Sequence, residues 1–128
     1  MSIIIDDLKY TENHEWVKDN GDGTVTCGIT DHAQHQLTDI VFVELPETGK
    51  TINKGEQIAV VESVKAVSDV YAPVSGEVIE VNSKLEDFPE TLNKESYDGG
   101  WILKLKVNNT EELVTLMASS KYKEFIGE

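Results

Sequence analysis

The chain has 128 residues, and its 11 basic and 24 acidic side chains give a formal net charge of −13. All the basic residues are lysines, so binding to nucleic acid or to an anionic membrane is not expected, because both depend on basic side chains that neutralise phosphates. The length and the absence of a composition break predict one domain over residues 1–128.

Most of the middle of the chain is predicted to form β-strands. Short segments rich in β-branched residues alternate with turn-forming glycine, asparagine and proline. Several short strands at close spacing are typical of a small antiparallel sandwich or barrel, so we expect an all-β fold. The expected strands are residues 24–29, 40–45, 57–61, 67–71, 77–81 and 101–107.

Short helices are expected around these strands. A capping-box pattern begins at Asp31 and predicts a helix that reaches Leu37. Ser83 is expected to cap a turn through residue 87, and Asn109 is expected to cap a C-terminal helix. Apolar residues recur at helical spacing in the C-terminal region and are expected to cover the sheet. They are Leu113, Leu116 and Met117, followed by Tyr122, Phe125 and Ile126.

The sequence contains no recognisable targeting or membrane-spanning segment. No stretch approaches the roughly 20 consecutive apolar residues of a membrane span. The first residues lack both the basic flank and long apolar core of a secretory signal and the arginine-rich pattern of an organellar signal. Because the chain begins with Met1, we expect a cytoplasmic protein, with an already processed chain as the alternative.

The usual catalytic and metal-binding patterns are missing from the sequence. His32 and His35 are three residues apart on a predicted helix, but a metal site needs further ligands that the spacing does not supply. Cys27 is the only cysteine and lies in an alternating apolar strand, which predicts a buried structural thiol. We therefore expect no metal site and no enzyme activity.

One lysine occupies a distinctive position between two predicted strands. Lys65 lies at the expected tip of a β-hairpin between small or apolar neighbours, with Glu62 and Asp69 on either side. The ordinary interpretation is a solvated surface lysine. The alternative is that a stiff hairpin presents this lysine, alone among the eleven, to a modifying enzyme.

Several ordered motifs decide between these interpretations. Residues 62–82 (ESVKAVSDVYAPVSGEVIEVN) resemble the lipoyl-attachment region of the glycine cleavage system H protein family. Residues 10–17 (YTENHEWV), 28–34 (GITDHAQ), 41–46 (VFVELP) and 93–101 (NKESYDGGW) resemble further segments of that family in the same order. The resemblance extends over residues 8–126.

Two related families fit the residues less well, and two positions depart from the family pattern. Biotin carriers usually have methionines beside the modified lysine, and lipoyl domains of 2-oxoacid dehydrogenases usually have Asp-Lys-Ala and are shorter. Thr38 stands where the H protein family usually has glycine, which matters if that backbone requires a positive φ. Glu95 and Ser96 replace a segment with proline, which is expected to loosen residues 94–100. Neither departure is expected to touch the modification site, so both concern the fit to partners.

The resemblance implies a barrel-sandwich hybrid fold of two small antiparallel sheets, with short flanking helices and a C-terminal helix. It implies that Lys65 carries lipoate through an amide bond, with Glu62 as part of the recognition context. The protein would be a monomeric carrier, and a lipoate ligase or lipoyl transferase would modify it. Its partners would be a pyridoxal-phosphate-dependent glycine decarboxylase, a tetrahydrofolate-dependent aminomethyltransferase and a flavin-containing dihydrolipoamide dehydrogenase.

The resemblance also implies a cleft that holds the aminomethyl-loaded arm. Glu15, His35 and Asp69 match family positions around such a cleft, and acidic side chains suit a cationic amine. The alternative is ordinary surface charge for Glu15 and Asp69 and a polar helix face for His35. Two other functions stay open: a lipoyl donor in a relay to other lipoyl enzymes, and an unmodified interaction module.

Overall fold

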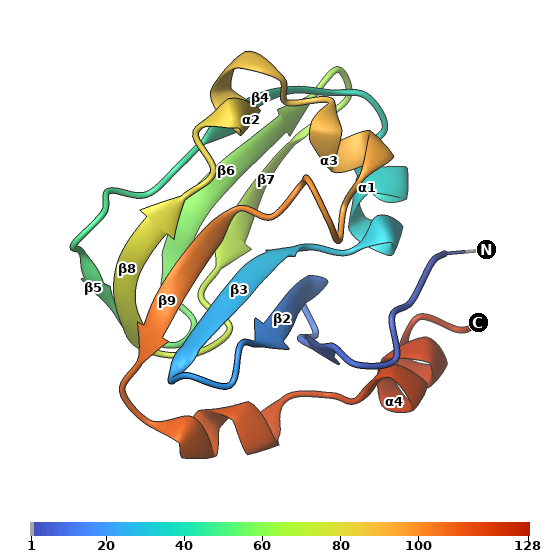
Figure 1. Cartoon of the computed structure of the whole chain (residues 1–128). Coiled ribbons are helices and arrows are strands. Elements are labelled where there is room, and N and C mark those ends of the chain that lie inside the picture. Colours follow the sequence, from blue (N-terminus) through green and yellow to red (C-terminus); the bar gives the residue numbers. More distant parts are fainter. Residues whose placement is uncertain (1) are drawn as a thin grey trace.

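The computed structural model describes residues 2–128 and contains two antiparallel sheets (Figure 1). The strands are β1 (Lys9–Tyr10), β2 (Glu15–Asp19), β3 (Thr24–Ile29), β4 (Ile40–Glu44), β5 (Thr51–Ile52), β6 (Gln57–Ser63), β7 (Val67–Tyr71), β8 (Gly76–Val81) and β9 (Leu103–Val107). One sheet has the strand order β1-β2-β3-β9-β8-β5, and the other has the order β4-β6-β7. This arrangement confirms the expected all-β fold of two antiparallel sheets.

All six strands expected from the sequence are present, with ends that differ from the expected ones by at most two residues. The two-residue strands β1 and β5 and the five-residue β2 were not expected. The β2 segment begins with Glu15 and ends with Lys18 and Asp19, so its composition lacks the apolar alternation of a half-buried strand. It forms because its five residues pair in register with β3.

Short helices flank the sheets: α1 (Asp31–Leu37), α2 (Lys84–Asp87), α3 (Thr91–Lys94), the 3-10 helix η1 (Thr110–Thr115) and α4 (Ser119–Phe125). The helix α1 starts at Asp31 as expected, but its N-cap is Thr30, whose side chain accepts a hydrogen bond from the Ala33 N–H, so the expected cap was wrong by one residue. Ser83 has helical dihedrals and makes no capping hydrogen bond, which contradicts its expected role. Asn109 does cap η1, by accepting from the Glu111 N–H.

Buried side chains form two clusters. The main core contains residues of both sheets, such as Val61 and Leu105, and a smaller cluster joins the two ends of the chain to the larger sheet. The Tyr10 and Tyr122 rings stack with centroids 4.5 Å apart, and the Tyr122 hydroxyl contacts His14 Nδ1 at 2.9 Å. Tyr122 is fully buried, whereas Phe125 is 51% exposed, so the expectation that both cover the sheet was wrong for Phe125. The segment that carries α4 therefore docks mainly through Tyr122 and Ile126.

Trp16 fixes the start of β2 against the rest of the fold. It lies opposite Gly28 on β3, where an added Cβ would be 2.7 Å from the indole nitrogen. The same nitrogen donates to the Ser96 carbonyl at 2.9 Å, and the Ser96 hydroxyl donates to the Leu92 carbonyl at 2.6 Å. The segment that departs from the family pattern is thus anchored by buried hydrogen bonds, in contrast to the loosening expected from the loss of proline.

Candidate functional site

Lys65 lies at the tip of the hairpin between β6 and β7. This hairpin lies next to the α1–β4 connection (Figure 1). The Ser63 N–H donates to the Ala66 carbonyl at 2.8 Å and closes the turn. The Ser63 hydroxyl oxygen accepts from the backbone N–H groups of Lys65 and Ala66 at 3.2 and 3.0 Å. These bonds fix the backbone on both sides of an exposed lysine side chain.

The last turn of α1 and the α1–β4 connection hold this tip through one backbone carbonyl each. Lys65 Nζ donates to the Gln36 carbonyl at 2.9 Å, and the Val64 N–H donates to the Asp39 carbonyl at 3.0 Å. Gln36 belongs to the last turn of α1, where carbonyl oxygens lack partners within the helix and suit a cation. The ammonium group therefore rests on the protein surface without a buried contact.

Thr38 lies between those two carbonyls in an unusual backbone conformation. It is the C-cap of α1, with φ 66° and ψ −144°. This region is close to one that glycine alone occupies readily. The backbone at this position thus has the positive φ that would make the change from glycine to threonine matter. Thr38 is also next to Asp39, whose carbonyl accepts from the Val64 N–H at the hairpin tip, although Thr38 itself bonds to Gln34 and Asn93.

Glu62 lies three residues before Lys65 on β6 and is half-buried. It pairs with Phe42 on β4 and with Val67 on β7 in the three-stranded sheet. Side chains of directly paired residues share one face of a sheet. The Glu62 carboxylate therefore lies on the face that also displays Phe42 and Val67, beside the hairpin tip.

Glu15 occupies a buried position at the edge of β7. Its carboxylate oxygens accept from the Thr11 hydroxyl at 2.5 Å and from the Tyr71 N–H at 3.2 Å. Burial raises the pKa of the Glu15 carboxyl above its ordinary value, while these hydrogen bonds act in the opposite direction. Neither donor was expected from the sequence, because Tyr71 contributes its backbone and Thr11 is four residues away along a bend.

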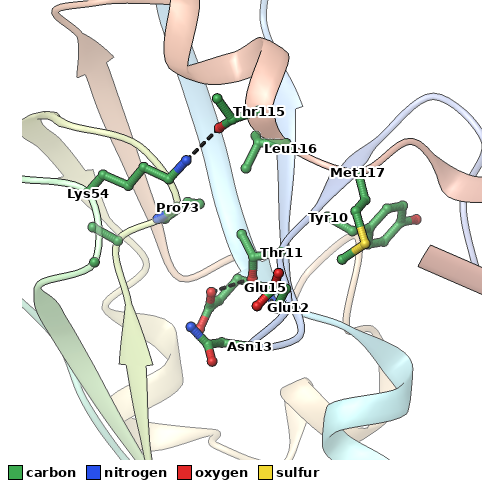
Figure 2. Close-up of a pocket in the computed structure, with 12 residues that line it drawn as sticks. Tyr10, Thr11, Glu12, Asn13, Glu15, Lys54, Pro73, Thr115, Leu116 and Met117 are labelled. Carbon is green, nitrogen blue, oxygen red and sulfur yellow. Dashed lines mark hydrogen bonds between the residues drawn. The ribbon is translucent and has the colours of Figure 1, made fainter. Parts of the chain in front are cut away.

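A pocket of about 300 Å³ opens beside Glu15. Figure 2 shows the hydrogen bond between Thr11 and Glu15 on one side of the pocket and the hydrogen bond between Lys54 and Thr115 on another. Pro73 and Met117 add apolar surface to the same pocket. The pocket can therefore accept a flexible group with an apolar stem and a polar end.

The other two residues expected in the cleft do not line this pocket. His35 is on α1, where its Nε2 lies 3.2 Å from Asp31 Oδ2 and its side chain is 61% exposed. Asp69 is exposed on β7 and accepts from Gln57 Nε2 at 3.2 Å. Within residues 2–128, no hydrogen bond or ion pair joins Glu15, His35 and Asp69 to one another.

The three residues lie at different distances from the lysine. His35 precedes Gln36, whose carbonyl accepts from Lys65 Nζ. Asp69 lies on β7, four residues after Lys65 in the chain. Glu15 binds the N–H of Tyr71, six residues from Lys65, which corresponds to roughly 20 Å of extended strand. The buried Glu15 and the exposed His35 and Asp69 thus do not form one compact constellation.

Cys27, His32 and His35, the other residues considered for catalysis or metal binding, contact neighbouring parts of the fold. Cys27 is buried in the main core, and burial raises the pKa of its thiol. The His32 ring packs against His14 with centroids 4.8 Å apart, whereas His35 contacts Asp31. Across residues 2–128, no group of three histidine, cysteine or acidic side chains has a geometry that could hold a metal ion. No helix in the same range is long and apolar enough to cross a membrane.

Comparisons with known proteins cover nearly the whole chain. The family model described as "Glycine cleavage H-protein" matches residues 8–128. The glycine cleavage system H protein of Chromohalobacter salexigens is 57% identical over 127 residues, which are 99% of this chain and 97% of that protein. That of Vibrio vulnificus is 58% identical over 121 residues, covering 94% and 96%.

A solved structure gives the same result for the fold. The crystal structure of a glycine cleavage system H protein from Mycobacterium marinum superposes with a TM-score of 0.86 at 38% identity. The match covers 98% of this chain and 100% of that one. The similarity therefore extends well beyond the lysine hairpin and includes both ends of the chain.

Proposed function

Because the chain belongs to the glycine cleavage H-protein family, we propose that it is a lipoyl carrier whose lipoate is attached to Lys65. The proposed partners are a glycine decarboxylase, a tetrahydrofolate-dependent aminomethyltransferase and a dihydrolipoamide dehydrogenase. A lipoate ligase or lipoyl transferase would load the arm. In this role the chain is a shared substrate of these enzymes and not a catalyst.

The observation that carries the proposal is the presentation of Lys65. Its side chain is exposed at the end of a hairpin whose backbone is fixed by Ser63, and its Nζ makes one surface hydrogen bond, to the Gln36 carbonyl. Acylation would replace the ammonium group with a neutral amide without leaving a buried charge or an unpaired buried atom. The residues at the tip therefore fit a covalently attached acyl group.

Attachment requires a neutral lysine amine and an activated lipoyl group, such as an acyl adenylate. The Nζ lone pair attacks the acyl carbon and forms the C–N bond, while the bond to the adenylate oxygen breaks. Nζ releases one proton before the attack and another as the amide forms. No oxidant is needed in this step. The exposed position allows a modifying enzyme to remove the proton from Nζ.

When attached, the lipoyl group would supply the disulfide and thiol chemistry that carries an aminomethyl group between enzymes. Residues along the arm's path would hold its polar end and exclude water. We propose Glu15, His35 and Asp69 for this purpose, with Glu15 as the residue that contacts a cationic end. Its buried carboxylate lies beside a pocket that has both polar and apolar lining residues.

The test begins with mass spectrometry of the chain expressed with lipoate and a lipoate ligase. We expect one lipoyl group on Lys65, none on the Lys65→Arg variant and normal modification of a Lys84→Arg control, in which another exposed lysine is changed. The lipoylated chain, but not the unmodified chain, should support glycine–bicarbonate exchange by a glycine decarboxylase. Modification at another lysine, or exchange without lipoate, would contradict the proposal.

A further inference from the structure

Four apolar side chains around the hairpin tip are exposed to solvent. Val41 and Phe42 lie on β4, Val64 lies at the tip and Val67 begins β7. Their exposed fractions range from 46% to 69%. Single exposed apolar residues are ordinary, but a group of this kind beside a reactive side chain is typical of an interaction surface. We call these four residues the hairpin patch.

A β-bulge creates half of this patch. Ile40 pairs with Ser63 and Phe42 pairs with Glu62, so Val41 is an extra residue in β4. A bulge places two residues of one strand opposite one residue of its neighbour. Ile40 and Val43 are both buried, and Val41 and Phe42 between them are both exposed. The strand thus displays two consecutive apolar side chains and still fills the core on either side.

The register places Phe42 and Val67 on the same face of the three-stranded sheet. Both pair with Glu62, Phe42 from β4 and Val67 from β7, and paired side chains point to the same side. The next outward row contains Glu44, Val60 and Asp69, which also pair across the three strands. The face beside Lys65 therefore displays Phe42 and Val67 on either side of the half-buried Glu62 near the tip, and Glu44 and Asp69 farther from it.

We propose that the hairpin patch is the docking surface for the enzyme that attaches lipoate to Lys65. This inference rests on the proposed function and deepens it by naming the surface of this chain that the enzyme recognises. The expected partner surface has apolar side chains that cover Phe42 and Val67 and basic side chains that face Glu62, Glu44 and Asp69. Apolar and aromatic side chains at the centre and charges at the rim are the usual composition of such interfaces.

The reach of the reaction favours this partner over the others. To form an amide at Nζ, the enzyme's acyl group must come within bonding distance of a lysine held on the protein surface by the Gln36 carbonyl. The enzyme must then contact the side chains next to the tip. Partners that act on the dithiolane work at the far end of the arm and do not require this contact.

The charges on the sheet agree with a basic partner. Lys65 is the only basic residue in β4, β6, β7 and the hairpin that joins β6 to β7, whereas these segments contain Glu44, Glu62 and Asp69. Lys65 loses its own positive charge during acylation, so the negative potential of the face increases once the product forms. Charge complementarity of this kind speeds association and weakens with added salt.

The test measures the initial rate of lipoyl incorporation by an ATP-dependent lipoate ligase, by intact-protein mass spectrometry, over a range of unmodified-chain concentrations. The patch variant combines Phe42→Ser with Val67→Thr. The control combines Phe88→Ser with Ile79→Thr, which removes an exposed aromatic and an exposed strand residue outside the patch. We expect KM to increase about tenfold or more for the patch variant and to change less than about twofold for the control.

Further measurements separate the possible outcomes. Circular dichroism and thermal unfolding must show that the variants fold. If the patch variant does not fold, the test is repeated with a Val64→Thr variant, which changes an apolar residue of the turn. An unchanged KM for a folded patch variant overturns the inference but leaves the proposed function intact. The inference is also wrong if only the KM of glycine decarboxylase rises, or if sedimentation shows that the patch joins two copies. Wild-type chain that takes no lipoyl group on Lys65 refutes the proposed function as well.

Discussion

Replacing Thr38 with glycine should stabilise the protein. Thr38 has φ 66° and ψ −144° at the end of α1, close to a region where a Cβ atom is strained. Both of its hydrogen bonds use the backbone: its N–H donates to the Gln34 carbonyl, and its carbonyl accepts from Asn93 Nδ2. The side chain is exposed, so glycine removes the strain without removing a partner.

The size of the effect follows from two opposing contributions. Relief of the backbone strain is worth on the order of 1–3 kcal/mol. The greater freedom of glycine in the unfolded chain costs about 0.4–1 kcal/mol. We therefore expect the free energy of unfolding of Thr38→Gly to rise by about 1 kcal/mol, which corresponds to roughly 4 °C in Tm for a chain of this length.

Urea denaturation monitored by circular dichroism measures this change, and two controls isolate its cause. Thr38→Ala removes the hydroxyl but keeps Cβ, so its stability should stay within about 0.5 kcal/mol of the wild type. Thr51→Gly changes an exposed threonine in β5, where φ is ordinary, and should destabilise by about 1 kcal/mol. If Thr38→Gly is no more stable than Thr38→Ala, the Cβ is not strained and the reasoning is wrong.

Three more predictions concern the buried groups. Burial raises the pKa of Glu15, so ionisation of this carboxyl opposes folding as pH rises. Unfolding curves should therefore show that the Glu15→Gln variant gains stability relative to the wild type between about pH 4 and 7, and a constant difference would contradict this. Burial and His32 lower the pKa of His14, so the stability of the wild type should fall as pH drops below about 6.5. The His14→Asn variant should lose less stability over that range in the same measurement, because asparagine tolerates the positive φ at this position. Gly28→Ala should lower the free energy of unfolding by about 2 kcal/mol in urea, because its Cβ would overlap the Trp16 ring, and an unchanged midpoint would show that the indole moves freely.

The strands on either side of Lys65 could be predicted from the sequence because β6 and β7 are rich in β-branched residues and are joined by a turn of only three residues. The six expected strands account for most of both sheets. The strand β2 was missed because its formation depends on pairing with β3, and its buried Glu15 has a polar side chain where a strand pattern calls for an apolar one. Tertiary pairing determined that element, and local composition did not.

The surroundings of the site were less predictable than its lysine. Lys65 contacts the Gln36 carbonyl, and Glu15 contacts the Tyr71 N–H, and neither partner uses a side chain that a motif could reveal. The hairpin patch depends on the bulge at Val41, which changes the side-chain alternation of β4 by one residue. Residues 40–45 form a nearly continuous apolar run, and such a run does not say which side chains face the solvent.

The strain at Thr38 and the position of Lys65 involve the same short segment. Gln36 and Asp39, on either side of Thr38, accept from Lys65 Nζ and from the Val64 N–H through backbone carbonyls. Strained backbone persists where the surrounding structure fixes it, and such positions cluster at functional sites. Because glycine keeps both carbonyls, Thr38→Gly separates two roles of this segment. If the folded geometry alone positions Lys65, the variant should be more stable and accept lipoate at the wild-type rate. A slower rate in the more stable variant would show that the threonine side chain stiffens the connection that holds the tip.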